Sequence, residues 1–173
     1  ANPAVFTAND SAAHNTGLFT WNTTCNHVRK NPYQLYFKAI DNATPVNLFD
    51  LKSMNIKVVG PAPRNLVAIP SGNSIRLSWN KNRCSNVSGY GIYRRNGLDG
   101  YLPGHCETGV PPSTGYQLIS TLTKPDTTFT DSELSRGIEY CYLVVALYPD
   151  GAESYASNEA CAQLKKGVPV ITN

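Results

Sequence analysis

The chain has 173 residues, of which 41% are hydrophobic and 16% charged, and its 15 Lys and Arg against 12 Asp and Glu leave a formal net charge of +3. This composition excludes a disordered chain, because 10% aromatic residues supply apolar surface for a folded core. It also excludes a basic nucleic-acid-binding stripe, and no run of about 18 apolar residues is present to span a membrane.

Turn-forming residues divide the chain into short segments, and almost none of it reads as helix. The 13 Gly and 12 Pro separate segments that are rich in Val, Ile, Tyr, Phe and Thr. Apolar and polar residues alternate in these segments, which is typical of half-buried strands and predicts an all-β sandwich or barrel. Before residue 60 we expect strands at residues 5–6, 17–21, 34–41 and 54–59.

A domain boundary is predicted at residues 60–63, Gly-Pro-Ala-Pro, where the prolines would stiffen a short linker. Residues 1–60 are too few to bury a large core, so we expect part of a larger sandwich; the alternative is a compact mini-sandwich. Residues 1–10 have neither a starting Met nor a signal-peptide pattern, so we expect a segment of a longer protein. Residues 61–164 hold seven more expected strands, and residues 165–173 are interpreted as a linker to a following domain. The seven strands are expected at 65–69, 74–80, 89–95, 116–121, 128–131, 138–148 and 159–164.

Several ordered motifs after the linker resemble the fibronectin type III family. The stretches PRNLVA at 63–68, SIRLSW at 74–79 and GYGIY at 89–93 resemble its first three strands. The pattern L-x-x-G-x-x-Y-x-Y-x-V-x-A at 134–146 resembles its tyrosine-corner strand. The pattern G-x-x-S-x-x-S-N at 151–158 is similar to the turn into its last strand.

The resemblance covers residues 61–164 and implies an immunoglobulin-like β-sandwich, preceded here by a smaller β unit. The chain departs from the family in an insertion at 96–115 and in four cysteines that typical members lack. Tyr-Arg-Arg followed by Cys-Glu-Thr-Gly in that insertion is similar to repeats of large secreted surface proteins of gliding, Bacteroidetes-type bacteria. In the N-terminal part, GLFTW at 17–21 and YFKAIDN at 36–42 resemble bacterial immunoglobulin-like or cadherin-like repeats.

Alternation along two strands predicts the core. Ile75, Leu77 and Trp79 share one face of their segment, which should point inward. The resemblance makes the face of Tyr140 and the alternate residues after it the core face of the long strand. The Tyr140 hydroxyl would then bond to the backbone between residues 134 and 137, which is a structural role.

The five cysteines, at 25, 84, 106, 141 and 161, lack the Cys-x-x-Cys spacing of a zinc or redox site. Alternation along their strands places Cys141 and Cys161 both on the outer face of the sheet. Side chains directly opposite on neighbouring antiparallel strands have Cβ atoms about 4.5–5.5 Å apart. We therefore predict a Cys141–Cys161 disulfide, and a second one between Cys84 and Cys106 that would pin the insertion. Cys25 would be left over. The alternative is buried free thiols; disulfides would indicate a compartment outside the reducing cytosol.

The long strand at 138–148 is apolar on both faces. Leu143, Val145 and Leu147 lie on the outer face, beside Tyr93 and Arg95 of the neighbouring strand. These five residues are a candidate contact surface, because exposed apolar patches mark interaction sites. The alternative, which we favour, is that the insertion folds back over this face, tethered by a Cys106 disulfide.

No pattern points to catalysis, a cofactor or a metal. The chain has no G-x-S-x-G, H-E-x-x-H or P-loop motif, and its three histidines, at 14, 27 and 105, are expected to be solvated loop residues. Asp41, with Asp10 and Asp50, offers too few oxygens for calcium, which takes six to eight, so we interpret Asp41 as a turn-capping residue.

These observations predict a non-catalytic, extracellular β-sandwich module of a larger cell-surface or secreted protein. Its role would be spacing, adhesion or protein contact, and its partners would be neighbouring domains of the same chain, another surface protein or a glycan. The alternative is a carbohydrate-binding accessory module of a secreted polysaccharide-degrading enzyme, with Trp21, Tyr33 and Tyr36 stacking on sugar rings. Fold analogy alone does not choose between them.

Overall fold

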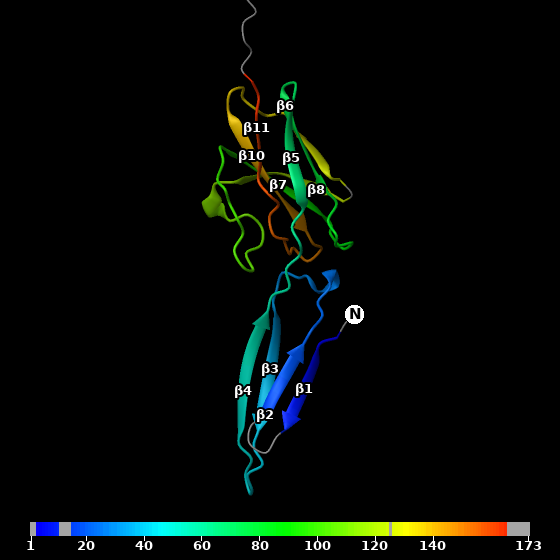
Figure 1. The fold of residues 1–173 in the computed structure, drawn as a ribbon, viewed down its shortest axis with the longest axis vertical. Coiled ribbons are helices and arrows are strands. Elements are labelled where there is room, and N and C mark those ends of the chain that lie inside the picture. The colour runs from blue at the N-terminus through cyan, green and yellow to red at the C-terminus, as the bar shows by residue number, and fades with distance from the viewer. Residues whose placement is uncertain (1–2, 11–14, 125, 166–173) are drawn as a thin grey trace, which may run out of the picture.

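A computed structural model describes residues 3–10, 15–124 and 126–165, and these residues form two β units placed end to end (Figure 1). The first unit consists of two antiparallel hairpins, joined by a short 3-10 turn, η1 (Cys25–His27). One hairpin pairs β1 (Val5–Asp10) with β2 (Asn15–Thr20), and the other pairs β3 (Tyr33–Ile40) with β4 (Phe49–Ile56).

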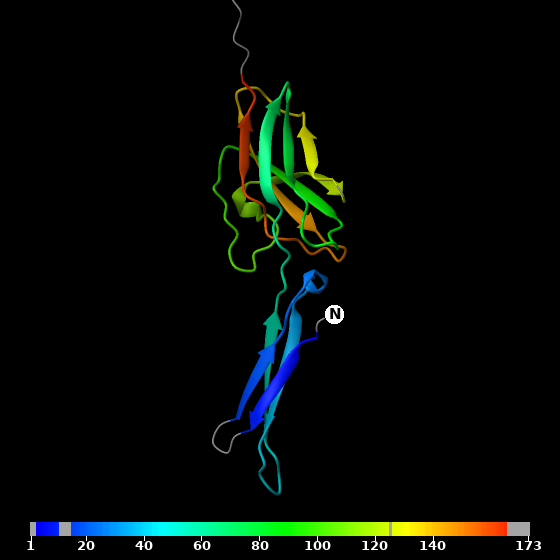
Figure 2. The same ribbon diagram turned by 45° about the vertical axis from the view of Figure 1, so that its right-hand side comes forward.

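The second unit is a sandwich of two antiparallel sheets (Figure 2). The smaller sheet has the order β5-β6-β9 and the larger has the order β11-β10-β7-β8. A second 3-10 turn, η2 (Pro112–Thr114), lies in the insertion between β7 and β8. The bounds of the strands are β5 (Arg64–Ser71), β6 (Ser74–Asn80), β7 (Gly89–Asn96), β8 (Gln117–Thr123), β9 (Thr128–Asp131), β10 (Glu139–Leu147) and β11 (Ala160–Gln163).

The structure confirms an all-β sandwich after the linker. Each of the seven expected segments contains or overlaps one observed strand, and the bounds differ by at most two residues at either end. In the first unit β4 begins at Phe49, five residues before the expected start. The reason is local: a carboxylate oxygen of Asp41 accepts the Leu48 N–H at 2.8 Å, which closes the connection and lets pairing with β3 begin at once. The expected linker at 165–173 lies, from residue 166 on, outside the described residues.

The core of the sandwich lies between the inner faces of the two sheets. Ile75 and Leu77 of β6 are fully buried, and Trp79 packs edge-on against Tyr90 of β7, with ring centroids 5.4 Å apart. Tyr140 is also buried, and its hydroxyl oxygen accepts the Ser135 N–H at 2.9 Å. This bond fixes the connection that leads into β10, which is the function of a tyrosine corner.

The hairpin unit has a much smaller core. Phe37 of β3 meets Phe6 of β1 and Phe19 of β2, with ring centroids 5.5 and 6.2 Å away. Phe6 nevertheless remains 53% exposed and Phe49 66% exposed. A two-stranded hairpin is marginally stable by itself, so this unit depends on further contacts. No helix in the described part of the chain is long and apolar enough to cross a membrane.

Candidate functional site

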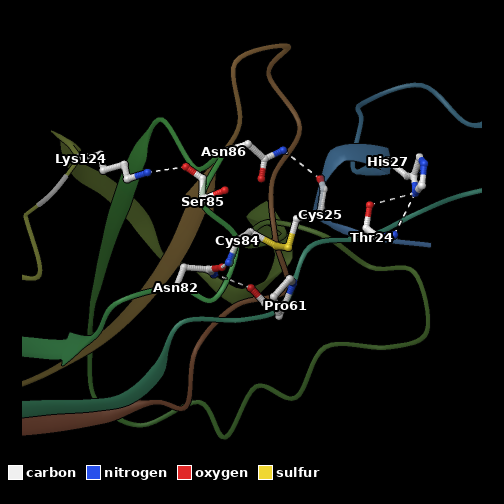
Figure 3. Close-up of a disulfide and its surroundings, with 9 residues drawn as sticks. All are labelled: Thr24, Cys25, His27, Pro61, Asn82, Cys84, Ser85, Asn86 and Lys124. Atoms are coloured by element: carbon white, nitrogen blue, oxygen red, sulfur yellow. Dashed lines mark hydrogen bonds between the residues drawn. A yellow bond between two sulfur atoms is a disulfide. The ribbon is translucent and has the colours of Figure 1, made fainter. Parts of the chain in front are cut away.

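The junction between the two units is closed by a disulfide (Figure 3). Cys25 lies in η1 of the hairpin unit, and Cys84 lies in the loop between β6 and β7 of the sandwich; their Cα atoms are 5.3 Å apart. Beside the sulfurs, the Asn86 side-chain amide donates to the Cys25 carbonyl at 2.9 Å. A covalent bond and a hydrogen bond therefore join the same two loops.

Asn82 holds the sandwich side of the junction in place. Its side-chain amide donates to the Pro61 carbonyl at 2.8 Å, and its side-chain oxygen accepts the Cys84 N–H at 2.9 Å. Its own N–H donates to the hydroxyl oxygen of the buried Tyr90 at 3.1 Å. Asn82 is buried, so these bonds lie where water competes little, and they fix the linker relative to the disulfide.

Apolar packing continues across the junction. Val28 after η1 and Val58 after β4 are both buried and belong to the same hydrophobic core cluster as Trp79. On a further loop, the Lys30 N–H donates to the Asp150 carboxylate at 2.7 Å. Asp150 is almost fully solvated, yet this hydrogen bond from Lys30 holds the pKa of the Asp150 carboxyl below its usual value. The two units thus share a core rather than meeting only through a linker.

His27 corrects one expectation at this junction. It is buried, not solvated, and its Nδ1 accepts the Thr24 N–H at 2.9 Å, which closes the η1 turn (Figure 3). Its ring packs against Trp21, with centroids 4.9 Å apart. Of the other two histidines, His105 is exposed and residue 14 lies outside the described residues.

The predicted Cys84–Cys106 disulfide is wrong, because Cys84 is bonded to Cys25. Cys84 is buried at the end of the sandwich that faces η1, whereas Cys106 is exposed in the insertion and is a free thiol. The expected leftover cysteine, Cys25, is therefore the paired one. The spacing of cysteines carried no information about this pair, since its members belong to different units.

Titration with a thiol reagent of the unreduced, denatured protein is expected to find one reactive thiol per chain. Peptide mapping should locate the label at Cys106, because the other four cysteines are in disulfides. Prior reduction should raise the count to five, which serves as the control. Labelling at Cys25 or Cys84 without reduction would contradict the junction described above.

Cys141 and Cys161 form the second disulfide, with Cα atoms 4.0 Å apart. They are direct partners in the register of β10 and β11, as the strand parity predicts. Among the described residues, these two and Glu159 are the only group of three with the spacing of metal ligands. Because both sulfurs are used in the disulfide, no thiolate is available there to bind a metal.

The insertion covers the outer face of the larger sheet. Leu143 and Val145 are fully buried, and the other three residues of the candidate contact surface, Tyr93, Arg95 and Leu147, are partly buried. Burial and the Glu153 carboxylate raise the pKa of Tyr93 to about 12. The apolar residues packed together on this face are Tyr93, Tyr101, Val110, Tyr116, Cys141, Leu143, Val145, Leu147, Ala156 and Cys161.

Hydrogen bonds, not a disulfide, hold the insertion down. The Glu159 carboxylate accepts the N–H groups of Asp99 and Gly100 at 2.9 and 2.8 Å. Burial opposes ionisation of Glu159, but these bonds and one from the Tyr116 hydroxyl outweigh it and lower its pKa. The Cys106 N–H donates to the Tyr155 hydroxyl oxygen at 3.1 Å. The docking expected of the insertion is therefore present, but its expected tether is not.

Arg95, the remaining candidate on this face, pairs with Asp99 inside the insertion and donates to the Thr114 carbonyl at 3.0 Å. Its neighbour Arg94 points to the other side of the sheet. There its Nη1 contacts both carboxylate oxygens of the buried Asp131, at 2.9 and 3.0 Å. The Tyr142 hydroxyl donates to the same carboxylate at 3.0 Å. Sequence reasoning missed this buried network.

The three aromatic residues proposed to stack on sugars do not form one platform. Trp21 and Tyr33 meet edge to face at an angle of 84°, and the Arg29 guanidinium lies 3.3 Å from the Tyr33 ring centroid. Tyr36 is 60% exposed but lies three residues from Tyr33 on the same strand, hence on the opposite face. A flat sugar-binding surface would need these rings on one side.

Asp41 makes the turn-capping contacts expected of it. One carboxylate oxygen accepts the N–H groups of Ala43 and Leu48, at 3.2 and 2.8 Å. Asp50 forms an exposed ion pair with Lys52 at 3.4 Å. The side chain of Asp10 lies outside the described residues.

Comparisons with known proteins give short matches. No family model matches the chain. A stretch of 101 residues, 58% of this chain, is 31% identical to the amylopullulanase of Thermoanaerobacterium thermosulfurigenes, and the match spans only 4% of the length of that relative. An Fn3-like protein from Clostridium thermocellum is 26% identical with a TM-score of 0.45, covering 65% of this chain and 100% of that one. Pectate lyase Pel3 from Pectobacterium carotovorum is 23% identical with a TM-score of 0.44, covering 64% of this chain and 28% of that one.

The second unit can be assigned to a fold type from its own geometry. Its two sheets, with the orders β5-β6-β9 and β11-β10-β7-β8, pack around Trp79, and the Tyr140 corner closes the connection into β10. The motifs that resemble fibronectin type III strands lie on β5, β6, β7 and β10 with the residues that lead into them, and on the turn before β11. Residues 64–163 therefore form a fibronectin type III-like domain.

Proposed function

We propose that this chain is a non-catalytic module of a larger extracellular or cell-surface protein, and that it works as a rigid spacer between neighbouring domains. The observation that carries this proposal is the junction, where the Cys25–Cys84 disulfide and a shared apolar core join two units that lie end to end. A covalent clamp between domains suits a part whose task is to hold a fixed distance and angle. Domain interfaces without such a clamp are generally mobile.

The two disulfides support an oxidising compartment, because structural disulfides persist in secreted and surface proteins and are rare in a reducing cytosol. The resemblance of the insertion to repeats of secreted surface proteins of gliding bacteria agrees with this location. Both the spacer role and its alternative require secretion, so the location does not separate them.

We further propose that residues 1–60 are part of a larger immunoglobulin-like or cadherin-like unit, and that residues 61–164 are a separate domain. Support comes from the exposure of Phe6, Leu18 and Phe49, which is far above that of a finished core. Neighbouring domains of the same chain are the partners that this arrangement favours.

Small-angle X-ray scattering of the whole chain tests the spacer proposal. We expect one elongated particle whose scattering fits the end-to-end arrangement of Figure 1 without an ensemble. The profile should stay the same at different ionic strengths, because the junction is covalent and apolar. Scattering that only a broad mixture of interunit angles can fit would overturn the rigid spacer.

The alternative is a carbohydrate-binding accessory module, which the 31% identity to a stretch of an amylopullulanase favours. In that case the chain should sediment with insoluble amylopectin, and a spacer should stay in solution. The edge-to-face arrangement of Trp21 and Tyr33 and the opposite direction of Tyr36 argue against stacking on a neutral sugar chain.

A further inference from the structure

A polar cavity of about 300 Å³ opens beside the junction, between the start of β5 and the loop that follows β6. Ligand sites in proteins begin at about this size. Two short segments provide its walls: residues 61–65 contribute one Arg and one Asn, and residues 80–83 alternate amide and basic side chains. The lining residues are Pro61, Ala62, Arg64, Asn65, Asn80, Lys81, Asn82 and Arg83.

Three cations share this cavity and no carboxylate lines it. Within the described part of the chain, Arg64, Lys81 and Arg83 form no ion pair and no side-chain hydrogen bond. Arg94 and Arg95 of the sandwich, in contrast, are both paired with Asp residues. Three like charges around one cavity create a positive potential that favours an anion.

The backbone of the cavity is fixed in advance. Arg64 lies directly opposite Asn80 in the β5–β6 register, and a bulge follows it before Val67. Both backbone groups of Leu66 within the bulge bond to the Asn158 side chain, at 2.9 and 3.0 Å. Bulges of this kind redirect side chains and are frequent near binding sites.

Asn65, inside the bulge, has a φ of 56°, a left-handed conformation that non-glycine residues rarely adopt. Its side chain and that of Asn80 form no hydrogen bond within the described residues, so both amides are free to bind a ligand. The floor, in contrast, is satisfied: Asn82 is held by Pro61 and Cys84 (Figure 3). A rigid floor with free polar groups above it is a prepared site.

We propose that this cavity, named here the junction cavity, binds an acidic polysaccharide through the carboxylates of its sugar units. Guanidinium groups bind carboxylates through two parallel hydrogen bonds, and amides both donate to and accept from hydroxyl groups. A uronate ring carries carboxylate and hydroxyls together, which matches Arg64 and Asn80 side by side. No aromatic side chain lines the cavity, so recognition rests on charge and hydrogen bonds rather than on stacking.

Binding of the whole, disulfide-intact chain to immobilised alginate, a polyuronate, tests the proposal. The triple variant R64Q/K81Q/R83Q is expected to bind at least about tenfold more weakly, because hydrogen bonds to charged groups are worth about that factor each. The control variant K38Q/R76Q/K165Q removes the same charge at positions outside the cavity and should bind as the wild type does. Equal losses in the two variants would overturn the site.

A second variant guards against misfolding as an explanation. Asn80→Asp keeps the size of an exposed side chain but places a carboxylate opposite Arg64, so alginate binding should fall while the melting temperature stays unchanged. Unchanged binding in this variant would also overturn the proposal.

Three other ligands test whether the junction cavity recognises an acidic sugar or negative charge alone. Pullulan, which is uncharged, should not bind, and inorganic sulfate should compete only weakly. Poly-glutamate of equal charge should bind more weakly than alginate; if it binds equally, the cavity recognises charge and not a sugar. Alginate binding and small-angle scattering test the two proposals separately. A chain that binds alginate but scatters as a flexible particle would overturn only the spacer, and a rigid chain that does not bind alginate would overturn only the junction cavity.

Discussion

Replacing Asp131 with alanine is expected to lower the free energy of unfolding of the sandwich by about 3–5 kcal/mol, the range found when one partner of a buried ion pair is removed. Asp131 lies at the end of β9, and its side chain is only 5% exposed. Its carboxylate receives the Arg94 guanidinium and the Tyr142 hydroxyl. Without it, the buried Tyr142 hydroxyl loses its partner, and the half-enclosed Arg94 guanidinium keeps only the Glu133 carbonyl, at 3.2 Å.

Tyr142 shows how closely this network is enclosed. Burial first, and then the neighbouring Asp131 carboxylate, raise the pKa of its hydroxyl far above the usual value. The Glu133 N–H also donates to Asp131, at 3.3 Å, so the carboxylate fixes the turn after β9 as well. The network therefore ties the smaller sheet, through Asp131, to β7 and β10 of the larger one.

Urea unfolding, followed by tryptophan fluorescence, measures the effect of Asp131→Ala. The control is Asp126→Ala, an exposed aspartate just before the same strand, which should change stability by less than about 0.5 kcal/mol. Tyr142→Phe, which removes one hydroxyl and leaves the ion pair, should fall between them, at about 1 kcal/mol. A loss below about 1 kcal/mol for Asp131→Ala would mean that the carboxylate is not buried as described.

The sequence predicts features whose partners are close along the chain. Period-two alternation is a local property, so it located β6 and β10 and the inward side of Trp79. The Cys141–Cys161 pair follows from the alternation of side chains along two neighbouring strands. Both cysteines fall on the outer face, and a shift of one residue along either strand would place its cysteine on the inner face. The Tyr140 corner bonds to Ser135, only five residues away.

Features that depend on three-dimensional placement were not predictable in this way. Cys25 and Cys84 are separated by 59 residues and belong to different units, so no period or spacing links them. Arg94 and Asp131 meet across the sandwich, and in the sequence Arg94 is one half of an Arg-Arg pair. The bulge that directs Asn65 into the junction cavity has no signal in composition.

Removing the disulfide of the junction is expected to release the hairpin unit while the sandwich stays folded. In the chain-entropy model, a crosslink over 59 residues stabilises by about 4 kcal/mol, against about 3 kcal/mol for the 20 residues between Cys141 and Cys161. The hairpin unit has little else to replace it, because its Phe37 cluster leaves Phe6 more than half exposed. The sandwich keeps its own core around Trp79.

Hydrogen exchange read by mass spectrometry measures this release in the variant C25S/C84S, with Cys106→Ser in every sample to prevent mispairing. Amides of β3 and β4 should lose protection by at least about a hundredfold, since 1.4 kcal/mol corresponds to tenfold. Amides of β7 and β10 should keep theirs. The matched variant C141S/C161S removes a crosslink inside the sandwich and leaves the junction closed, so it should lower the protection of β10 and β11 without releasing β3 and β4 selectively. If C25S/C84S left β3 and β4 protected, the shared core of Val28 and Val58 would hold the units together by itself, and the disulfide would not be the clamp.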